Sequence, residues 1–203
     1  VFREAFGIWP TTFFLFIIPA AAAGPSFILL TTWIASKVSG KRLVTPDVYQ
    51  SLAKISGYIL AGYVLLKTAD TLFWIRDTAP SLGVHPNSFF ANQPGFTALH
   101  LLEVAVFGFL PMAIFLTKRL RERLGWMVAA AVLNCLGIVV NRYVLTIQTL
   151  ALPTLPFDEI LSYTPSWQET GTFLMVIAYG MLVYSFSFRY GNLFPQEREL
   201  QQG

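Results

Sequence analysis

The sequence predicts an all-α fold, a polytopic transmembrane helix bundle of about five spanning helices. Of its 203 residues, 55% are hydrophobic and only 12% are charged, and the mean hydropathy is +0.57. This apolar content exceeds what the core of one soluble domain needs. In addition, polar connections separate five apolar runs of roughly 20 residues or more, the length at which a helix crosses a bilayer.

The first predicted helix covers residues 9–36, which carry no charge, with Pro10 at its start and kinks at Pro19 and Gly24-Pro25. The remaining four are predicted at residues 52–75, 95–117, 125–148 and 166–188. Four polar segments connect these helices, namely residues 37–51, 76–94, 118–124 and 149–165. The second and fourth of these are long and rich in Pro, Asn, Ser and Thr, as expected of surface loops that hold a partner subunit.

The distribution of Lys and Arg predicts the orientation in the membrane. Ten of these residues lie on one predicted side, at positions 37, 41, 42, 54, 118, 119, 121, 123, 189 and 198, and only Arg3 and Arg76 lie on the other. The positive-inside rule places the more basic side in the cytoplasm. We therefore expect one domain in a bacterial or archaeal cytoplasmic membrane, with its N-terminus outside and residues 189–203 as a polar cytoplasmic tail.

The composition also excludes several kinds of protein. A net charge of +3, from 14 Lys+Arg and 11 Asp+Glu, is too small and too scattered for a nucleic-acid surface. Cys135 is the single cysteine, so the chain cannot form an internal disulfide framework, a Cys-ligated iron–sulfur cluster or a zinc knuckle. We expect no metal and no cofactor bound by this chain, and any redox centre to belong to a partner subunit.

Ionisable and amide side chains occur within four of the five predicted spans. Burying such groups in a bilayer costs a few kcal/mol each, so those that persist usually face a bundle interior and are candidates for function. From the predicted ends of the helices they form one layer, roughly 5–12 Å inside the outer boundary. The layer comprises Lys67, Asp70, His100, Glu103, Asn141, Arg142 and Glu169. At helical spacing, two stripes share a face: Tyr63, Lys67, Asp70 and Trp74, and Phe96, His100, Glu103 and Phe107.

Purely structural roles remain open for these residues. Glu169 completes a capping box with Ser166, and Lys67 either extends toward the membrane surface or neutralises Asp70. Arg142 needs a partner, so an ion pair with one of the three carboxylates of the layer is the alternative to a contact with a ligand. The sequence alone does not decide between these roles.

A quinone suits such a layer of polar groups within aromatic helices. Its two carbonyl oxygens accept hydrogen bonds and take up two protons with two electrons, and its isoprenoid tail requires an apolar surface. A di-haem cytochrome is disfavoured, because only His85 and His100 could supply axial ligands. No motif for nucleotide binding or hydrolysis occurs.

From the residue types, we assign proton handling, the catalytic role, to Asp70, His100 and Glu103. The polar groups best suited to bind the substrate are Asn141, Arg142 and Glu169.

Two motifs resemble a known family. Asn141-Arg142-Tyr143 near the end of one helix, followed by Tyr163-Thr164-Pro165-Ser166-Trp167-Gln168-Glu169 at the start of the next, resembles the C-terminal part of the NrfD/PsrC family, especially HybB-like hydrogenase subunits. The resemblance is clearest over residues 95–190. It implies a quinone-reactive membrane subunit without its own redox cofactor. It also implies two partners: an iron–sulfur, ferredoxin-like subunit, and a catalytic subunit that is a hydrogenase, a molybdenum enzyme or a multihaem cytochrome.

The family generally has eight to ten spans, with a quinone pocket in the first four, so these five helices would be the later part of a larger subunit. The polar layer would then be a second quinone pocket, part of a proton route or a salt-bridge network.

The leading hypothesis is a quinone- or quinol-binding subunit of a respiratory oxidoreductase complex, with menaquinone or ubiquinone as substrate. The alternatives are a proton- or ion-translocating subunit without quinone chemistry and a structural membrane anchor. A nearly apolar cytoplasmic half argues against a conducting path. We expect contacts with membrane lipid and none with nucleic acid.

Overall fold

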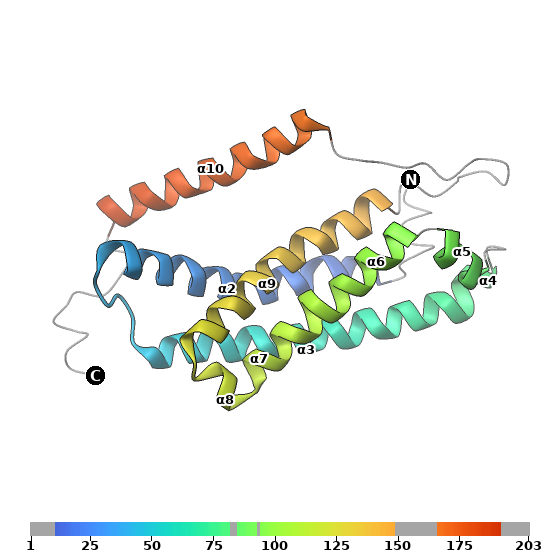
Figure 1. The fold of residues 1–203 in the computed structure, drawn as a ribbon, viewed down its shortest axis with the longest axis horizontal. Coiled ribbons are helices and arrows are strands. Elements are labelled where there is room, and N and C mark those ends of the chain that lie inside the picture. The colour runs from blue at the N-terminus through green and yellow to red at the C-terminus, as the bar shows by residue number, and fades with distance from the viewer. Residues whose placement is uncertain (1–10, 82–84, 93, 149–165, 192–203) are drawn as a thin grey trace.

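The computed structural model describes residues 11–81, 85–92, 94–148 and 166–191. Every regular element in these ranges is helical, and five helices are long and apolar enough to cross a membrane (Figure 1). They span Thr12–Ser39, Pro46–Ser81, Pro94–Leu116, Leu124–Thr146 and Trp167–Tyr190. The predicted fold class, the all-α bundle of a multi-pass membrane protein, is confirmed. The loop predicted at residues 149–165 lies outside the described residues, as does nearly all of the predicted tail.

The first spanning helix, α2 (Thr12–Ser39), has no charged residue before Lys37. Pro19 and Pro25 both lie inside it, and the helix continues through them. It ends at Gly40, whose φ of 66° is the left-handed conformation that residues with a side chain rarely adopt. This residue turns the chain toward the next helix.

The second span begins earlier and ends later than the predicted residues 52–75. It consists of α3 (Pro46–Phe73), the π-helical segment η1 (Trp74–Thr78) and α4 (Ala79–Ser81). Pro46 is a favourable first helical residue, because its missing N–H would have no partner there. At about 1.5 Å per residue, the helix exceeds the roughly 30 Å of a hydrocarbon layer, so its polar ends extend beyond that layer.

The segment predicted as a loop at residues 76–94 is largely helical where it is described. The second span continues into it, and α5 (Pro86–Asn92) follows. The prolines of this segment predict a loop, whereas Pro86 and Pro94 each begin a helix, because proline is also favourable at the first helical position. The elements that follow are α6 (Pro94–Leu102), η2 (Glu103–Phe109), α7 (Leu110–Leu116), α8 (Lys118–Arg121), α9 (Leu124–Tyr143), η3 (Val144–Gln148) and α10 (Trp167–Tyr190).

Three of the spans change from α-helical to π-helical hydrogen bonding, in η1, η2 and η3. Segments of this kind are rare and often occur at functional sites, since the wider turn redirects side chains.

Figure 1 shows the start of α6 at one end of the bundle and α8 at the other. We call the end that contains η1, η3 and the start of α6 the polar end, and the end that contains residues 40–45 and α8 the basic end.

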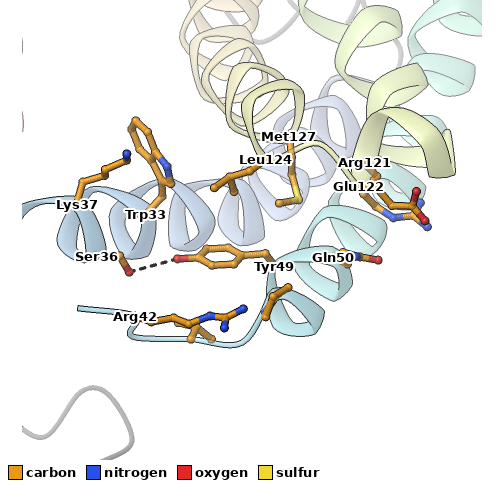
Figure 2. A pocket seen from close by; sticks show the side chains of 12 residues that line it. Trp33, Ser36, Lys37, Arg42, Tyr49, Gln50, Arg121, Glu122, Leu124 and Met127 are labelled. Carbon is orange, nitrogen blue, oxygen red and sulfur yellow. Dashed lines mark hydrogen bonds between the residues drawn. The ribbon is translucent and has the colours of Figure 1, made fainter. Parts of the chain in front are cut away.

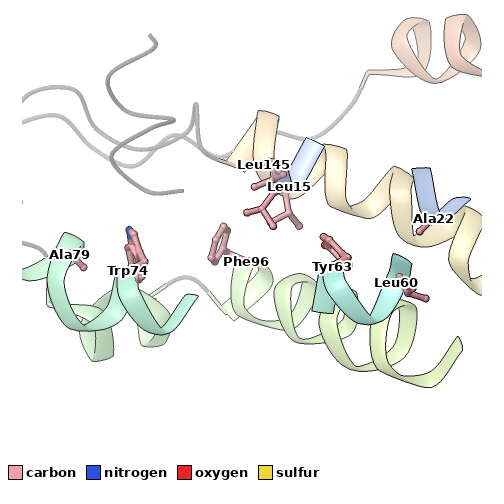
Figure 3. Packing of buried hydrophobic residues seen from close by; sticks show 9 residues of the cluster. Leu15, Ala22, Leu60, Tyr63, Trp74, Ala79, Phe96 and Leu145 are labelled. Carbon is pink, nitrogen blue, oxygen red and sulfur yellow. The ribbon is translucent and has the colours of Figure 1, made fainter. Parts of the chain in front are cut away.

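Four of the spans pack together, and the fifth does not join their core. Buried hydrophobic residues of the first four form two clusters. One extends from the middle of the bundle to the polar end (Figure 3) and includes Leu15, Leu60, Tyr63, Trp74 and Phe96. The other lies toward the basic end and includes Leu29, Tyr49, Phe115 and Met127. By contrast, α10 lies apart from the other helices in Figure 1, and none of its residues is buried.

Two glycines allow the helices to approach one another closely. A Cβ atom on Gly57 of α3 would lie 2.8 Å from Cβ of Phe115, and one on Gly137 of α9 would lie 2.9 Å from Cβ of Phe107. Association of helices in a membrane depends on such close packing, because lipid supplies no hydrophobic driving force between them. These contacts hold the third span against both α3 and α9.

Candidate functional site

A buried carboxylate, Glu103, lies among polar groups from three helices. Its side chain is 1% exposed. Oε1 accepts hydrogen bonds from the Tyr63 hydroxyl of α3 and from Nδ2 of Asn141 on α9, the latter at 2.8 Å. Nδ2 of Asn141 also lies 2.9 Å from the Tyr63 hydroxyl. A single carboxylate oxygen therefore joins three spans.

Lys67 provides the counter-charge of this carboxylate. Its Nζ lies 3.4 Å from Oε1 of Glu103, and the side chain is fully buried. We expected Lys67 to extend toward the membrane surface or to neutralise Asp70, and this ion pair with Glu103 was missed. Spacing along one helix favoured Asp70 three residues away, whereas the packing of the third span against α3 brings Glu103 to the amine.

His100 extends the cluster by one helical turn toward the polar end. Its Nδ1 lies 3.7 Å from Oε2 of Glu103, and its Nε2 lies 3.3 Å from Oγ1 of Thr71. The ring stacks on Phe96, with an interplanar angle of 10°. The predicted pairing of His100 with Glu103 is thus present in the geometry. We call Tyr63, Lys67, His100, Glu103 and Asn141 the Glu103 cluster.

Asp70 lies next to this cluster but has a different partner. Its Oδ1 accepts hydrogen bonds from the backbone N–H and the hydroxyl of Thr11, at 3.2 and 2.7 Å. Its Oδ2 is buried and has no hydrogen-bond partner among the described residues. Asp70 therefore connects α3 to the start of α2 and keeps one acceptor oxygen inside the protein.

Arg142 contacts α2 and forms no ion pair with a carboxylate of the described residues. Its Nη2 donates a hydrogen bond to the Phe16 carbonyl oxygen at 2.9 Å, and the guanidinium lies 4.1 Å from the centre of the Phe16 ring. The expected alternatives were an ion pair with Glu103, Asp70 or Glu169 and a contact with a ligand. Consecutive residues of a helix point about 100° apart, so Asn141 reaches Glu103 while Arg142 faces α2.

Glu169 forms the capping box at the start of α10. Its Oε2 accepts a hydrogen bond from the Ser166 backbone N–H at 2.7 Å, and its own N–H donates to the Ser166 hydroxyl at 3.3 Å. The side chain is exposed, on a helix that buries none of its residues. Glu169 is therefore not part of the buried cluster. Its position is that of a helix-capping residue, the structural role considered for it above.

A second buried polar group lies closer to the basic end and was missed. Nδ2 of Asn134 lies 3.0 Å from the Ala22 carbonyl oxygen, 2.9 Å from the Ser26 hydroxyl and 3.1 Å from the Ser56 hydroxyl. The two hydroxyls are 2.6 Å apart, and Ser56 also donates to the Ala22 carbonyl. We call these residues the Asn134 network. The expected apolar half of the bundle thus contains an uncharged polar layer.

The spacing of the sequence contained a signal for this network. Asn134 precedes Asn141 by two helical turns, and Ser56 precedes Tyr63 by the same interval. An amide in an apolar span usually hydrogen-bonds across helices. The predicted polar layer rests on ionisable groups and on the Asn141-Arg142 pair, so it does not include Asn134 and Ser56.

The chemistry that the Glu103 cluster offers is proton transfer in a shielded site. A carboxylate, an imidazole and a phenol lie within one connected set, and an ammonium group balances the negative charge. Aromatic side chains continue from the cluster toward the polar end, where Trp74 and Phe90 meet edge to face and Phe96 stacks on His100. Among the described residues, no three His, Cys, Asp or Glu side chains group as a metal site.

Comparison with known proteins gives one family and two curated relatives. The family model for polysulphide reductase, NrfD, matches residues 6–153. A menaquinone reductase integral membrane subunit of Nitratidesulfovibrio vulgaris (strain Hildenborough) is 39% identical over 203 residues, covering 100% of the chain and 48% of that relative. A second curated protein of that organism is 26% identical over 187 residues, covering 88% of the chain and 44% of its own length. The chain spans about half the length of these relatives. No solved structure matches it significantly.

Proposed function

Because the chain belongs to the NrfD (polysulphide reductase) family, we propose that it is a quinone-reactive membrane subunit of a respiratory oxidoreductase complex. Its similarity to a menaquinone reductase membrane subunit favours menaquinone over ubiquinone as the substrate. The observation that carries the proposal is the Glu103 cluster, which gathers ionisable proton donors and acceptors from three helices inside the bundle. The HybB-like character expected from the sequence stays a prediction.

The cluster suits a quinone headgroup because its members supply what the carbonyl oxygens need. Reduction to the quinol forms two O–H bonds and consumes two electrons and two protons, and oxidation reverses this balance. We assign proton handling to Glu103 and His100, with Asp70 as a further acceptor toward the polar end. Asn141 orients Glu103, and Arg142 fixes α9 against α2. The aromatic side chains between His100 and Trp74 provide an apolar wall for the quinone.

The electrons in this proposal come from, or go to, a partner subunit. An iron–sulfur, ferredoxin-like subunit at the polar end is the partner that we propose, itself joined to a hydrogenase, a molybdenum enzyme or a multihaem cytochrome. The position of the cluster near the polar end supports this arrangement, since a short distance to the partner's redox centre favours electron transfer. We place the chain in the cytoplasmic membrane, with the polar end outside.

Glu103→Gln tests the proposal, since it is nearly isosteric and removes the carboxylate. In the purified complex, we expect menaquinol-linked turnover to fall roughly 100-fold, the usual contribution of a positioned acid or base. Activity of the partner enzyme with an artificial dye should stay unchanged, because the dye bypasses the membrane subunit. Asp47→Asn, the same change at an exposed carboxylate of α3, is the matched control.

Full menaquinol turnover in an assembled Glu103→Gln complex would contradict a role in quinone protonation. It would favour the structural anchor, in which Glu103 only holds three helices together. Loss of both quinone and dye activity with an intact complex would also contradict the proposal, since the defect would then lie in the partner.

A proton-translocating role is the second candidate, and the Asn134 network favours it. This network places hydrogen-bonding groups about two turns nearer the basic end than Asn141, in the half of the bundle that was expected to be apolar. If protons pass this way, Asn134→Leu in proteoliposomes should reduce proton movement per quinone while turnover stays within about twofold of the unmodified complex. Equal proton movement in both proteins would leave the network a purely structural role.

A further inference from the structure

A cavity of about 440 Å³ lies at the basic end, far along the bundle from the Glu103 cluster. Its walls come from the end of α2, residues 42–50 and the segment 121–127 that joins α8 to α9 (Figure 2). Its volume is in the range that holds small-molecule ligands. The proposed quinone chemistry makes no use of this cavity.

Three cations and one carboxylate line the cavity: Lys37, Arg42, Arg121 and Glu122. Within the described ranges, none of the three cations forms an ion pair with a carboxylate. Glu122 lies 3.9 Å from Lys118, which is not a lining residue. The lining therefore carries three positive charges against the one negative charge of Glu122, and its net charge is positive.

Arg121 is the buried member of this set. It is only 7% exposed, and its Nη1 donates a hydrogen bond to the Phe115 carbonyl oxygen at 2.7 Å. Its Nε is buried and has no hydrogen-bond partner among the described residues. Because an unpaired donor on a buried cation is costly, a hydrogen-bond acceptor placed next to this guanidinium would stabilise it.

The start of α9 adds positive potential to the same cavity. Leu124, its first residue, lines the wall, and Arg123 at the N-cap offers no side-chain hydrogen bond to the first turn. The free amides of a helix N-terminus carry a partial positive charge and attract anions. This contribution acts together with Arg121, which lies three residues earlier.

The other walls of the cavity are apolar and aromatic. Trp33, Val44 and Met127 line it, and the Tyr49 hydroxyl lies 3.5 Å from that of Ser36 (Figure 2). Trp and Tyr are enriched where a spanning helix meets the headgroup region. The cavity thus combines a basic part with an apolar part at the end of a span, which is the arrangement that matches a lipid.

We propose that this cavity binds an anionic phospholipid of the leaflet at the basic end. Its headgroup lies at the cavity, where the charges of Lys37, Arg42 and Arg121 around the lining attract it, and an acyl chain lies against Trp33 and Met127. Clusters of basic residues at membrane surfaces bind anionic headgroups in this way. A free phosphate ion shares the headgroup chemistry but would make no use of the apolar wall.

Native mass spectrometry of the full chain in detergent tests this proposal, with phosphatidylglycerol, phosphatidylcholine and inorganic phosphate as separate probes. Phosphatidylglycerol should bind the unmodified chain best. The Lys37→Gln, Arg42→Gln double variant should bind it roughly tenfold or more weakly, since two attractive charges are lost. Both residues are exposed, so the fold tolerates their replacement. The control is Lys54→Gln, Arg119→Gln, which removes two exposed charges from the same side but none from the lining.

Retention of phosphatidylglycerol by the control and its loss from the Lys37, Arg42 variant would support the site. Equal weakening of both variants would overturn it, because diffuse attraction by the basic end would then suffice. Equal binding of phosphatidylcholine would overturn it as well, since the cations would not select the headgroup. Inorganic phosphate binding as tightly as the lipid would identify a soluble-anion site and contradict the lipid.

Discussion

Single residues in this bundle owe their position to the cost of placing charge in an apolar medium. Glu103 is acceptable there because Tyr63, Asn141 and Lys67 satisfy one carboxylate oxygen and His100 approaches the other. Each partner comes from a packed helix, so the contacts of this carboxylate form only when the three spans are correctly assembled. The residues proposed for proton handling are also the ones that hold these helices in register.

Tyr63→Phe should separate the hydrogen bond from the packing of the ring. The change keeps the buried aromatic ring and removes the hydroxyl that contacts Glu103 and Asn141. A hydrogen bond to a charged group contributes about 1.5–3 kcal/mol, so we expect quinone turnover to fall roughly tenfold or more. Steady-state kinetics of the complex with a soluble menaquinol analogue measure this effect.

Tyr58→Phe is the control for that substitution. Tyr58 is on the same helix but is 69% exposed, so loss of its hydroxyl should leave turnover unchanged. If Tyr63→Phe and Tyr58→Phe behave alike, the Tyr63 hydroxyl has no part in the reaction.

At the scale of elements, glycine residues decide how closely the helices approach, because they have no side chain. The third span packs against Gly57 of α3 and Gly137 of α9, and its η2 segment begins at Glu103. A π-helical turn changes the face that the following residues present. Close approach and this turn together place Glu103 within reach of both neighbouring helices.

Gly137→Ala should therefore destabilise the bundle. The new Cβ would lie 2.9 Å from Cβ of Phe107 and 3.2 Å from its carbonyl oxygen, so α9 must move away from the third span. Overpacking of this kind typically costs about 1–3 kcal/mol. Thermal unfolding of the detergent-solubilised chain, followed by circular dichroism, should show a lower midpoint.

Gly62→Ala is the matched control on α3, where a Cβ atom meets nothing within 4 Å. It should leave the midpoint unchanged or raise it, because alanine favours the helix over glycine. Equal destabilisation by both substitutions would show that the close contact at Gly137 does not hold the helices together.

At the scale of the whole molecule, five apolar helices present hydrophobic side chains outward and collect polar side chains within the first four. Most large apolar residues on α10 are exposed, as expected of a surface that meets lipid or another membrane helix. The two ends differ in charge: α8 and residues 40–45 are basic, whereas the buried carboxylates Asp70 and Glu103 lie toward the other end. This difference is the basis of the proposed orientation.

Cysteine labelling tests that orientation on the whole molecule. In a Cys135→Ala background, a membrane-impermeant maleimide added to spheroplasts should modify Ser81→Cys and spare Ser39→Cys, which lie at opposite ends of the spans. Permeabilised cells should label both, which controls for accessibility. The reverse pattern would place the polar end in the cytoplasm, and with it the proposed iron–sulfur partner.

The sequence by itself determined the helical class, the five spans and the buried faces of two of them. Spans follow from length and hydropathy, and faces follow from helical spacing, so these features are local. The stripe of Tyr63, Lys67, Asp70 and Trp74 is buried as predicted, and the capping box of Ser166 with Glu169 is present. Pro46 and Pro86 were misread as loop residues, because proline also begins helices.

Only the tertiary structure decided which polar groups meet. Lys67 pairs with Glu103, Arg142 reaches the Phe16 carbonyl oxygen, and Asn134 joins Ser26 to Ser56. These pairings depend on the rotation and depth of each helix relative to its neighbours. Rotation and depth result from many small packing contacts, such as Gly137 against Phe107, and no single segment of the sequence contains them.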